Sequence, residues 1–216
     1  MKKNLKMVMV LTFLLFIYTS ICAFSYANNV SSDIAQSVFR LHVLANSDSK
    51  EDQDLKYIVR DNLLNYMNSI CGNCTSKEEA IELVLENKDK FEQIAIQTIQ
   101  EQGYDYSVKI NIGNFEFPTK NYGDISLPSG LYDALRVEIG DAKGQNWWCV
   151  MFPPLCFVDV SSGVVPEESK ELMENNLTEE EFALVSDKSN NEIQFKFKIL
   201  EFFANNRTNY CKKIEI

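Results

Sequence analysis

The N-terminus combines a basic start with a long apolar run, and this feature decides where the rest of the chain folds. Three lysines lie within the first six residues, residues 7–21 are almost unbroken apolar, and Ser25-Tyr26-Ala27 gives a small-x-small exit. This is the organisation of a secretory signal peptide, residues 1–27, and we expect cleavage after Ala27. An uncleaved anchor is the alternative, because residues 7–24 just reach the length that spans a bilayer. The following residues are therefore expected to fold after export, where disulfides can form.

Composition and charge narrow the classes of protein further. The chain has 216 residues, 45% of them hydrophobic and 24% charged, which is typical of a folded domain. There are 21 Lys and Arg against 31 Asp and Glu, and loss of the three leader lysines takes the net charge from −10 to −13. Such an acidic excess argues against a nucleic-acid partner, which needs Lys and Arg to neutralise phosphates. His42 is the one histidine, so sites built on two imidazoles are excluded, and we expect neither a metal nor a cofactor.

Hydrophobic spacing divides the first part of the exported chain into a tether and a mixed α and β region. Residues 28–37 are polar and are interpreted as a short tether. Residues 38–45 place large apolar side chains on one face of a predicted strand. Apolar positions then recur at helical spacing over residues 50–70. A Ser followed three residues later by a Glu forms a capping box that opens a second helical region over residues 76–102.

Strand patterns dominate the next part of the chain. Apolar residues alternate over residues 106–112, and two further strands are predicted at 131–139 and 147–152. Residues 140–146 are interpreted as the turn between the last two strands. Residues 115–130 contain two Pro and two Gly, so we expect more loop than regular structure there.

Two segments of opposite charge follow. Residues 161–192 carry nine acidic and two basic side chains, which favours a solvated acidic linker. Residues 193–216 are basic and amphipathic, and we interpret them as a helix although their apolar residues also alternate as in a strand. The expected fold class is α+β: a single compact domain over residues 38–160, with a small, mostly antiparallel sheet, two N-terminal helices packed on it and a C-terminal helical extension.

One segment does not resemble ordinary core. Residues 146–157 contain both tryptophans of the chain, two cysteines and a Pro pair. A strand that reaches Pro-Pro cannot continue to donate to a ladder, so the chain must end or turn there. Adjacent tryptophans on a strand point to opposite faces, so both are buried only if both faces are covered. A buried strand is one interpretation and a docking surface for a partner is the other. The candidate partner-binding residues are Trp147, Trp148, Phe152, Pro153, Pro154 and Phe157.

The cysteines suggest two local disulfides. Cys149 and Cys156 flank the Pro-Pro turn and could close a small loop after export. Cys71 and Cys74 have the spacing of a redox motif, but they follow a predicted helix instead of a strand, which favours a structural disulfide or two plain thiols. Cys211 is then the expected unpaired cysteine of the exported chain.

Catalytic motifs are absent from the sequence. It has no nucleophile elbow, aspartic protease motif, phosphate-binding loop or zinc protease motif. His42 lies in an apolar strand, where a structural imidazole is the default interpretation. An exported thiol oxidoreductase using Cys71 and Cys74, or a hydrolase using His42, remains an alternative. A third hypothesis is a structural domain of the cell envelope, held at the membrane by residues 2–24 and the basic C-terminal end.

Four stretches of the chain carry a family resemblance. They are residues 39–48, 117–123, 128–132 and, above all, the Trp-Trp-Cys-Val-Met-Phe-Pro-Pro-Leu-Cys-Phe run within 146–157. Together they resemble the stage II sporulation protein R family of endospore-forming bacteria, over about residues 38–159.

The resemblance implies a signalling protein instead of an enzyme. Members of this family are made in the forespore and exported into the space between the two membranes. There they trigger a membrane-embedded aspartic protease of the mother cell, which processes the precursor of sigma factor E. By this resemblance the expected partner is that protease, with contact to the membrane surface as a further expectation and no small-molecule substrate.

Overall fold

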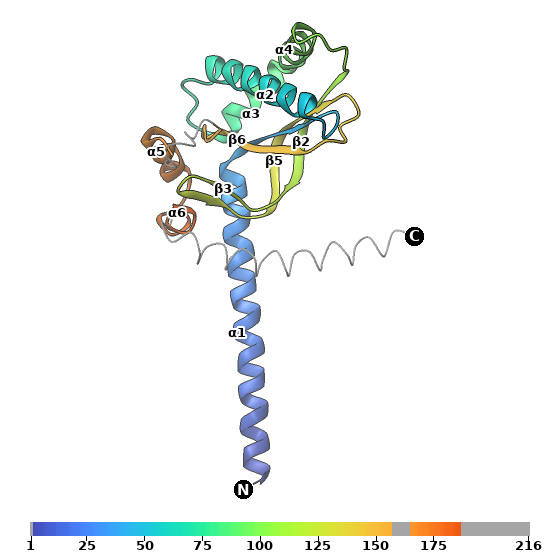
Figure 1. The fold of residues 1–216 in the computed structure, drawn as a ribbon. Helices are drawn as coiled ribbons and strands as arrows, with labels where there is room; N and C mark the ends of the chain where they lie inside the picture. Colours follow the sequence, from blue (N-terminus) through green and yellow to red (C-terminus); the bar gives the residue numbers. More distant parts are fainter. Residues whose placement is uncertain (1, 157–164, 187–216) are drawn as a thin grey trace.

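The computed structural model describes residues 2–156 and 165–186, and it has an α+β fold as expected (Figure 1). A four-stranded sheet has the order β2 (Val108–Phe117), β5 (Gly130–Ile139), β1 (Phe39–Leu44) and β6 (Asn146–Phe152). The β1 and β5 strands are parallel, and the two outer pairings are antiparallel. Helices cover one face of this sheet, which we call the first face, and a small hairpin lies over part of the opposite, second face.

Helices α2 (Lys50–Ile70), α3 (Lys77–Glu86) and α4 (Lys88–Glu101) contribute apolar side chains to the core of the first face. The side chain of Ser49 caps α2, and the predicted cap Ser76 accepts a hydrogen bond from the backbone N–H of Glu79 at the start of α3. The single helical region expected over residues 76–102 is in fact two helices. Asn87 leaves the helical conformation, and its side chain bonds the carbonyl of Leu83 and the hydroxyl of Tyr66, which makes a helix end possible in mid-segment.

The connection between β5 and β6 is not a hairpin turn, because β1 lies between these two strands. Residues 140–146 instead cross the end of β1, where the N–H of Gly144 bonds the carbonyl of Ala45 at 3.0 Å. Gly140 has φ of 56°, and a Cβ there would collide with the side chain of Asn46. The predicted turn between these strands is therefore a crossover, because a connection of this length can also pass over one strand.

The prediction of loop over residues 115–130 is wrong in part. Strand β2 continues to Phe117, and β3 (Lys120–Tyr122) pairs with β4 (Ile125–Leu127) as a hairpin. The two strands are joined by Gly123 and Asp124, and Gly123 adopts φ of 62°. The buried residues Ile125 and Leu127 place this hairpin on the core of the second face.

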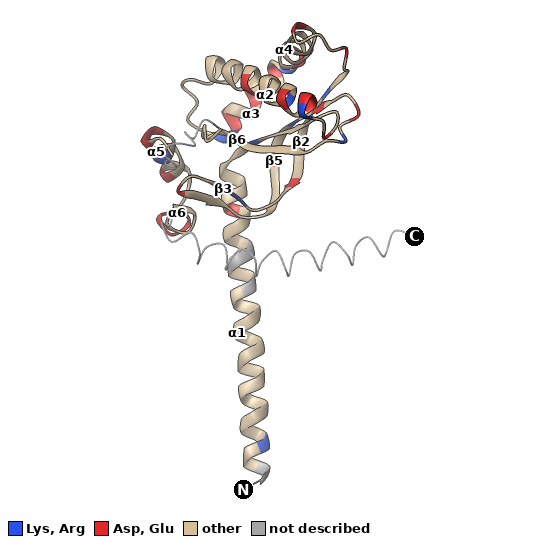
Figure 2. Ribbon diagram, viewed as in Figure 1, with Lys and Arg blue, Asp and Glu red and all other residues tan. Residues whose placement is uncertain are grey.

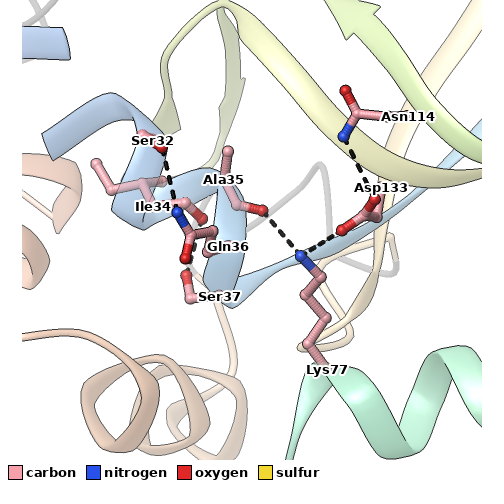
Figure 3. A network of polar contacts seen from close by, with 8 residues as sticks. All are labelled: Ser32, Ile34, Ala35, Gln36, Ser37, Lys77, Asn114 and Asp133. Atoms are coloured by element: carbon pink, nitrogen blue, oxygen red, sulfur yellow. Dashed lines mark hydrogen bonds and ion pairs between the residues drawn. The ribbon is translucent and has the colours of Figure 1, made fainter. Parts of the chain in front are cut away.

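Helix α1 (Lys2–Ser37) includes both the expected leader and the expected tether in one continuous element that projects away from the domain (Figure 1). Its apolar residues Asn4–Ala23 are unburied, and by length and composition they are sufficient to cross a membrane. Its last turns pack on the domain, with Ile34 fully buried. Figure 3 shows how this end is held: the ammonium of Lys77 lies 2.6 Å from the carboxylate of Asp133 and 3.4 Å from the carbonyl of Ala35.

The described part of the expected acidic linker, residues 165–186, contains helices α5 (Glu167–Asn176) and α6 (Glu179–Ser186). The acidic residues of these helices are red on the ribbon in Figure 2, while Met173 and Val185 are buried against the second face. Lys170 on α5 pairs with Asp124 of the hairpin at 2.8 Å, and both side chains are more than four-fifths buried. The segment 193–216, with Cys211, lies outside the described residues, as does Phe157.

A candidate partner-binding surface on the second sheet face

The two faces of the sheet differ in chemistry although the same strands form both. On β1 the side chains of Phe39, Leu41 and Val43 enter the core beneath the helices, while Arg40 and His42 point to the second face. A buried strand in water-soluble folds seldom carries two such polar groups side by side. The second face is therefore where a site must be sought.

Arg40 is fully buried in an aromatic cage. Its guanidinium lies 4.1 Å from the ring centre of Phe117 and 4.6 Å from that of Tyr132, and its Nη2 donates to the hydroxyl of Tyr122 at 2.6 Å. Its Nε and Nη1 have no hydrogen-bond partner, and no carboxylate among the described residues pairs with it. Cation–π contact and one hydrogen bond thus stabilise a charge that is otherwise uncompensated.

His42 lies next to this cage and is 4% exposed. Its ring stacks on Trp148 with 3.7 Å between centroids, and its Nε2 lies 2.7 Å from the side-chain oxygen of Asn146. Burial lowers the pKa of His42 to about 4, with the positive charges of Arg136 and Arg40 acting in the same direction and the Asn146 hydrogen bond opposing them. The imidazole is therefore neutral at pH 7, donates through Nε2 and leaves Nδ1 unpartnered.

A single row of side chains runs across all four strands at this level. The register pairs Asn111 with Arg136, Arg136 with His42 and His42 with Trp148. Arg136 is 31% exposed, and its Nε lies 2.9 Å from a carboxylate oxygen of Glu138. The cage end of the second face is covered by the hairpin and by the end of α1, whereas Asn111, Arg136 and Trp148 are partly exposed.

The structure also places the residues that the sequence singled out. Trp147 and Trp148 point to opposite faces of β6, and both are half-buried. Trp147 lies beside α2, where the guanidinium of Arg60 is 4.3 Å from its ring centre. Phe152 and Pro153 are buried, so surface contact is left to the half-buried Trp147, Trp148 and Pro154.

Both suggested disulfides are present, Cys149–Cys156 and Cys71–Cys74. The first folds the Pro-Pro turn back along β6, where the N–H of Leu155 bonds the carbonyl of Val150 at 3.3 Å. The hydroxyl of Tyr122 donates to the carbonyl of Trp148 at 3.2 Å. These contacts occupy part of the outer edge of β6 and oppose the addition of another strand there. In the part of the chain that the structure describes, no group of three His, Cys, Asp or Glu side chains could hold a metal.

Sequence reasoning missed Arg40 and Arg136. The sequence did contain a signal for Arg40: it lies between the apolar residues Phe39 and Leu41, in a strand whose apolar run is typical of burial on both faces. The sequence does not show that β5 lies beside β1 in parallel, which is the pairing that places Arg136 against His42.

Comparison with known proteins identifies the family. A family model described as stage II sporulation protein R matches residues 35–162. The chain belongs to the stage II sporulation protein R family. A curated relative named Stage II sporulation protein R, from Bacillus subtilis (strain 168), is 38% identical over 138 residues, which is 64% of this chain and 62% of the relative. The match therefore spans less than two thirds of that relative. No solved structure matches the chain.

The matched region holds the whole sheet and every side chain of the Arg40 cage, the strand row and the tryptophan pair, whereas α5 and α6 lie beyond it. Membership of the family supports a role in sporulation. The apolar N-terminal part of α1 is compatible with a signal peptide, and the two disulfides fit a location outside the cytoplasm.

Proposed function

We propose that this protein is the secreted signal by which the forespore reports to the mother cell during endospore formation. In this proposal it acts in the space between the two membranes and triggers the membrane-embedded aspartic protease that processes the sigma factor E precursor. The family match over residues 35–162 carries the proposal. The apolar start of α1 and the disulfides support it, because each suits a protein that acts after export.

A signal of this kind needs contact and not chemistry. A bound protein shifts the protease toward activity only by binding the active conformation more tightly than the inactive one. The imidazole that a hydrolase would use is buried and stacked on Trp148. The half-buried tryptophans offer the amphipathic contact area that protein interfaces favour.

Co-expression in a non-sporulating host tests the function directly. The host makes the sigma factor E precursor and the protease, with or without the full chain of this protein, and immunoblotting measures the processed fraction. We expect processing only when the chain is present. A second member of the family that triggers processing in the same host serves as the competent control. Unprocessed precursor with this chain, beside processed precursor with the control, would refute the proposal.

A membrane-anchored envelope domain is the second candidate, because α1 continues without a break from its apolar part into the packed turns at Ile34. Fractionation of the same host separates the two. A released signal gives a soluble exported form that begins near Asn28. An anchored domain stays in the membrane fraction and keeps Met1.

A further inference from the structure

We propose that the partner docks on the open half of the second face, where Arg136 receives a carboxylate from an acidic segment of the partner. The open half is the surface formed by His42, Lys109, Asn111, Arg136, Glu138 and Trp148. This inference rests on the proposed function and adds to it the surface that makes contact and the chemistry that is recognised.

The geometry of Arg136 fits this role. A guanidinium has five N–H donors, and in Arg136 the ion pair with Glu138 is made at Nε, which lies 2.9 Å from the carboxylate but outside hydrogen-bond geometry. No hydrogen bond or ion pair within the described ranges uses its Nη1 or Nη2. The group lies 5.4 Å from the ring centre of Phe115 and is partly exposed. Two adjacent NH₂ groups on a supported, accessible guanidinium can bind a carboxylate through two parallel hydrogen bonds.

The charges on this face favour an acidic partner. In the open half Arg136 and Lys109 carry two positive charges and Glu138 one negative charge, a net charge of about +1 near neutral pH, and the buried Arg40 adds a positive charge beside it. The whole chain has a net charge of −10. Burial is the main cause of the lowered pKa of His42, and the charges of Arg136 and Arg40 lower it further, as expected where a positive potential reaches the middle of the strand row. An incoming carboxylate would be stabilised by that potential.

Aromatic side chains frame the same place. Trp148 stacks on His42 on one side of Arg136, and Phe115 lies beneath its guanidinium on the other. Tryptophan and arginine are the residues that contribute most often to binding energy at protein interfaces. Figure 2 shows red acidic residues on α5, α6 and the start of α2, so those helices would repel the acidic segment that the open half attracts.

Photo-cross-linking locates the surface. A photoreactive phenylalanine replaces Lys109, which is 71% exposed on the second face, or Lys50, which is 86% exposed on α2. Both changes remove one exposed positive charge, so they are matched controls for each other. The full chain is co-expressed with the protease and irradiated in isolated membranes. We expect an adduct with the protease from position 109 and none from position 50. An adduct only from position 50 would overturn the proposed surface.

Substitution of Arg136 tests the chemistry. Loss of a charge-assisted pair predicts that Arg136→Gln lowers the adduct yield about tenfold, that Arg136→Glu lowers it further, and that Arg136→Lys is intermediate because a lysine cannot make two parallel bonds. Lys50→Gln should leave the yield unchanged. Raising the salt concentration of the membranes should also lower the wild-type yield, because ions screen exposed charges, and Arg136→Gln should weaken that dependence.

The outcomes separate this inference from the proposed function. If the wild-type chain fails to trigger processing while the family control succeeds, the proposed function fails. A different result refutes the carboxylate site alone. In that result the wild-type chain triggers processing, Arg136→Glu is equally active, and the yield of cross-linked adduct does not change with the salt concentration. Circular dichroism and intact disulfides establish that each variant is folded.

Discussion

The first and second faces of the sheet are built from the same four strands and have different physical tasks. On the first face Leu41, Val43, Leu135 and Val137 are fully buried beneath α2 and α4. On the second face the intervening positions hold Arg40, His42 and Arg136 among aromatic rings, and helices cover only part of it. Because side chains alternate between the two faces of a strand, one face stabilises the fold through apolar packing. The other face holds polar groups whose burial costs free energy.

This difference teaches where function should be expected. Burying an apolar side chain stabilises the protein by its transfer from water, and close packing makes its shape matter. Burying Arg40 without a carboxylate gives no such benefit. A buried polar group that does not stabilise the fold indicates a functional site.

The largest expected effect concerns the first face. Leu41→Ala removes a side chain with no exposed surface and should lower the free energy of unfolding by about 3 kcal/mol. The matched change Leu131→Ala, at a position 58% exposed, should alter it by less than about 0.5 kcal/mol. Urea denaturation of the full chain in detergent micelles measures both. Equal losses would break the distinction between packed and exposed positions.

The next effect is a pH dependence that comes from the second face. The pKa of His42 is about 4 in the folded protein and about 6.5 when unfolded. Below pH 6.5 the unfolded state therefore binds a proton that the folded state does not, so stability falls as the pH drops from 6.5 to 4, by up to about 3 kcal/mol.

Two measurements check this dependence. The chain has one histidine, so its imidazole NMR signal can be followed without assignment and should titrate near pH 4. His42→Gln should remove most of the loss of stability between pH 6.5 and 4.5. The carboxylates of Asp52, Asp124 and Asp133 do not account for it, because their pKa values are lowered below the usual range and they act at lower pH. A midpoint above pH 6 would contradict the buried, neutral imidazole.

A smaller effect tests the Arg40 cage. Tyr122→Phe removes a hydroxyl that accepts from Arg40 and should cost about 1–2 kcal/mol. Arg40→Met should lie within about 1 kcal/mol of the wild type, because an apolar side chain suits this site without the cost of burying a charge. In the Arg40→Met chain, Tyr122→Phe should then cost less than it does alone. If the losses in free energy of unfolding for Arg40→Met and Tyr122→Phe simply add in the double variant, the two side chains are not energetically coupled.

The smallest effect concerns the covered part of the second face. Lys170→Met breaks the largely buried pair with Asp124 and should lower the free energy of unfolding by about 1 kcal/mol. Lys50→Met breaks the pair with Asp54, whose side chains are 86% and 57% exposed, and should cost less than about 0.5 kcal/mol. Thermal denaturation of the two chains under one condition compares them. The reverse order would mean that α5 is not held through Lys170.

Much of the first face was predictable from the sequence, and little of the second. Helical spacing and the capping box that begins at Ser76 are local signals, and the structure confirms the helices that they predict. Strand alternation likewise located β1, β5 and β6. The hairpin β3–β4 was missed because three-residue strands give almost no periodic signal, and its turn consists of Gly123 and Asp124.

The candidate site depends on long-range order. Arg136 and His42 are 94 positions apart in the sequence, and only the parallel pairing of β1 with β5 brings them together. The opposite orientation of Trp147 and Trp148 was predictable from strand geometry, but what each one contacts was not. Tyr122 reaches Arg40 because a hairpin folds over the sheet.

The most direct test compares the two faces in one assay. Processing of the sigma factor E precursor is measured in the co-expression host for Leu41→Ala and Trp148→Ala, each normalised to the amount of folded full chain. We expect Leu41→Ala to retain near wild-type processing per folded molecule, because it changes stability alone. Trp148→Ala should lose about tenfold or more, because it removes an aromatic contact of the docking surface. Equal processing per folded molecule in both variants would contradict the assignment of signalling to the second face.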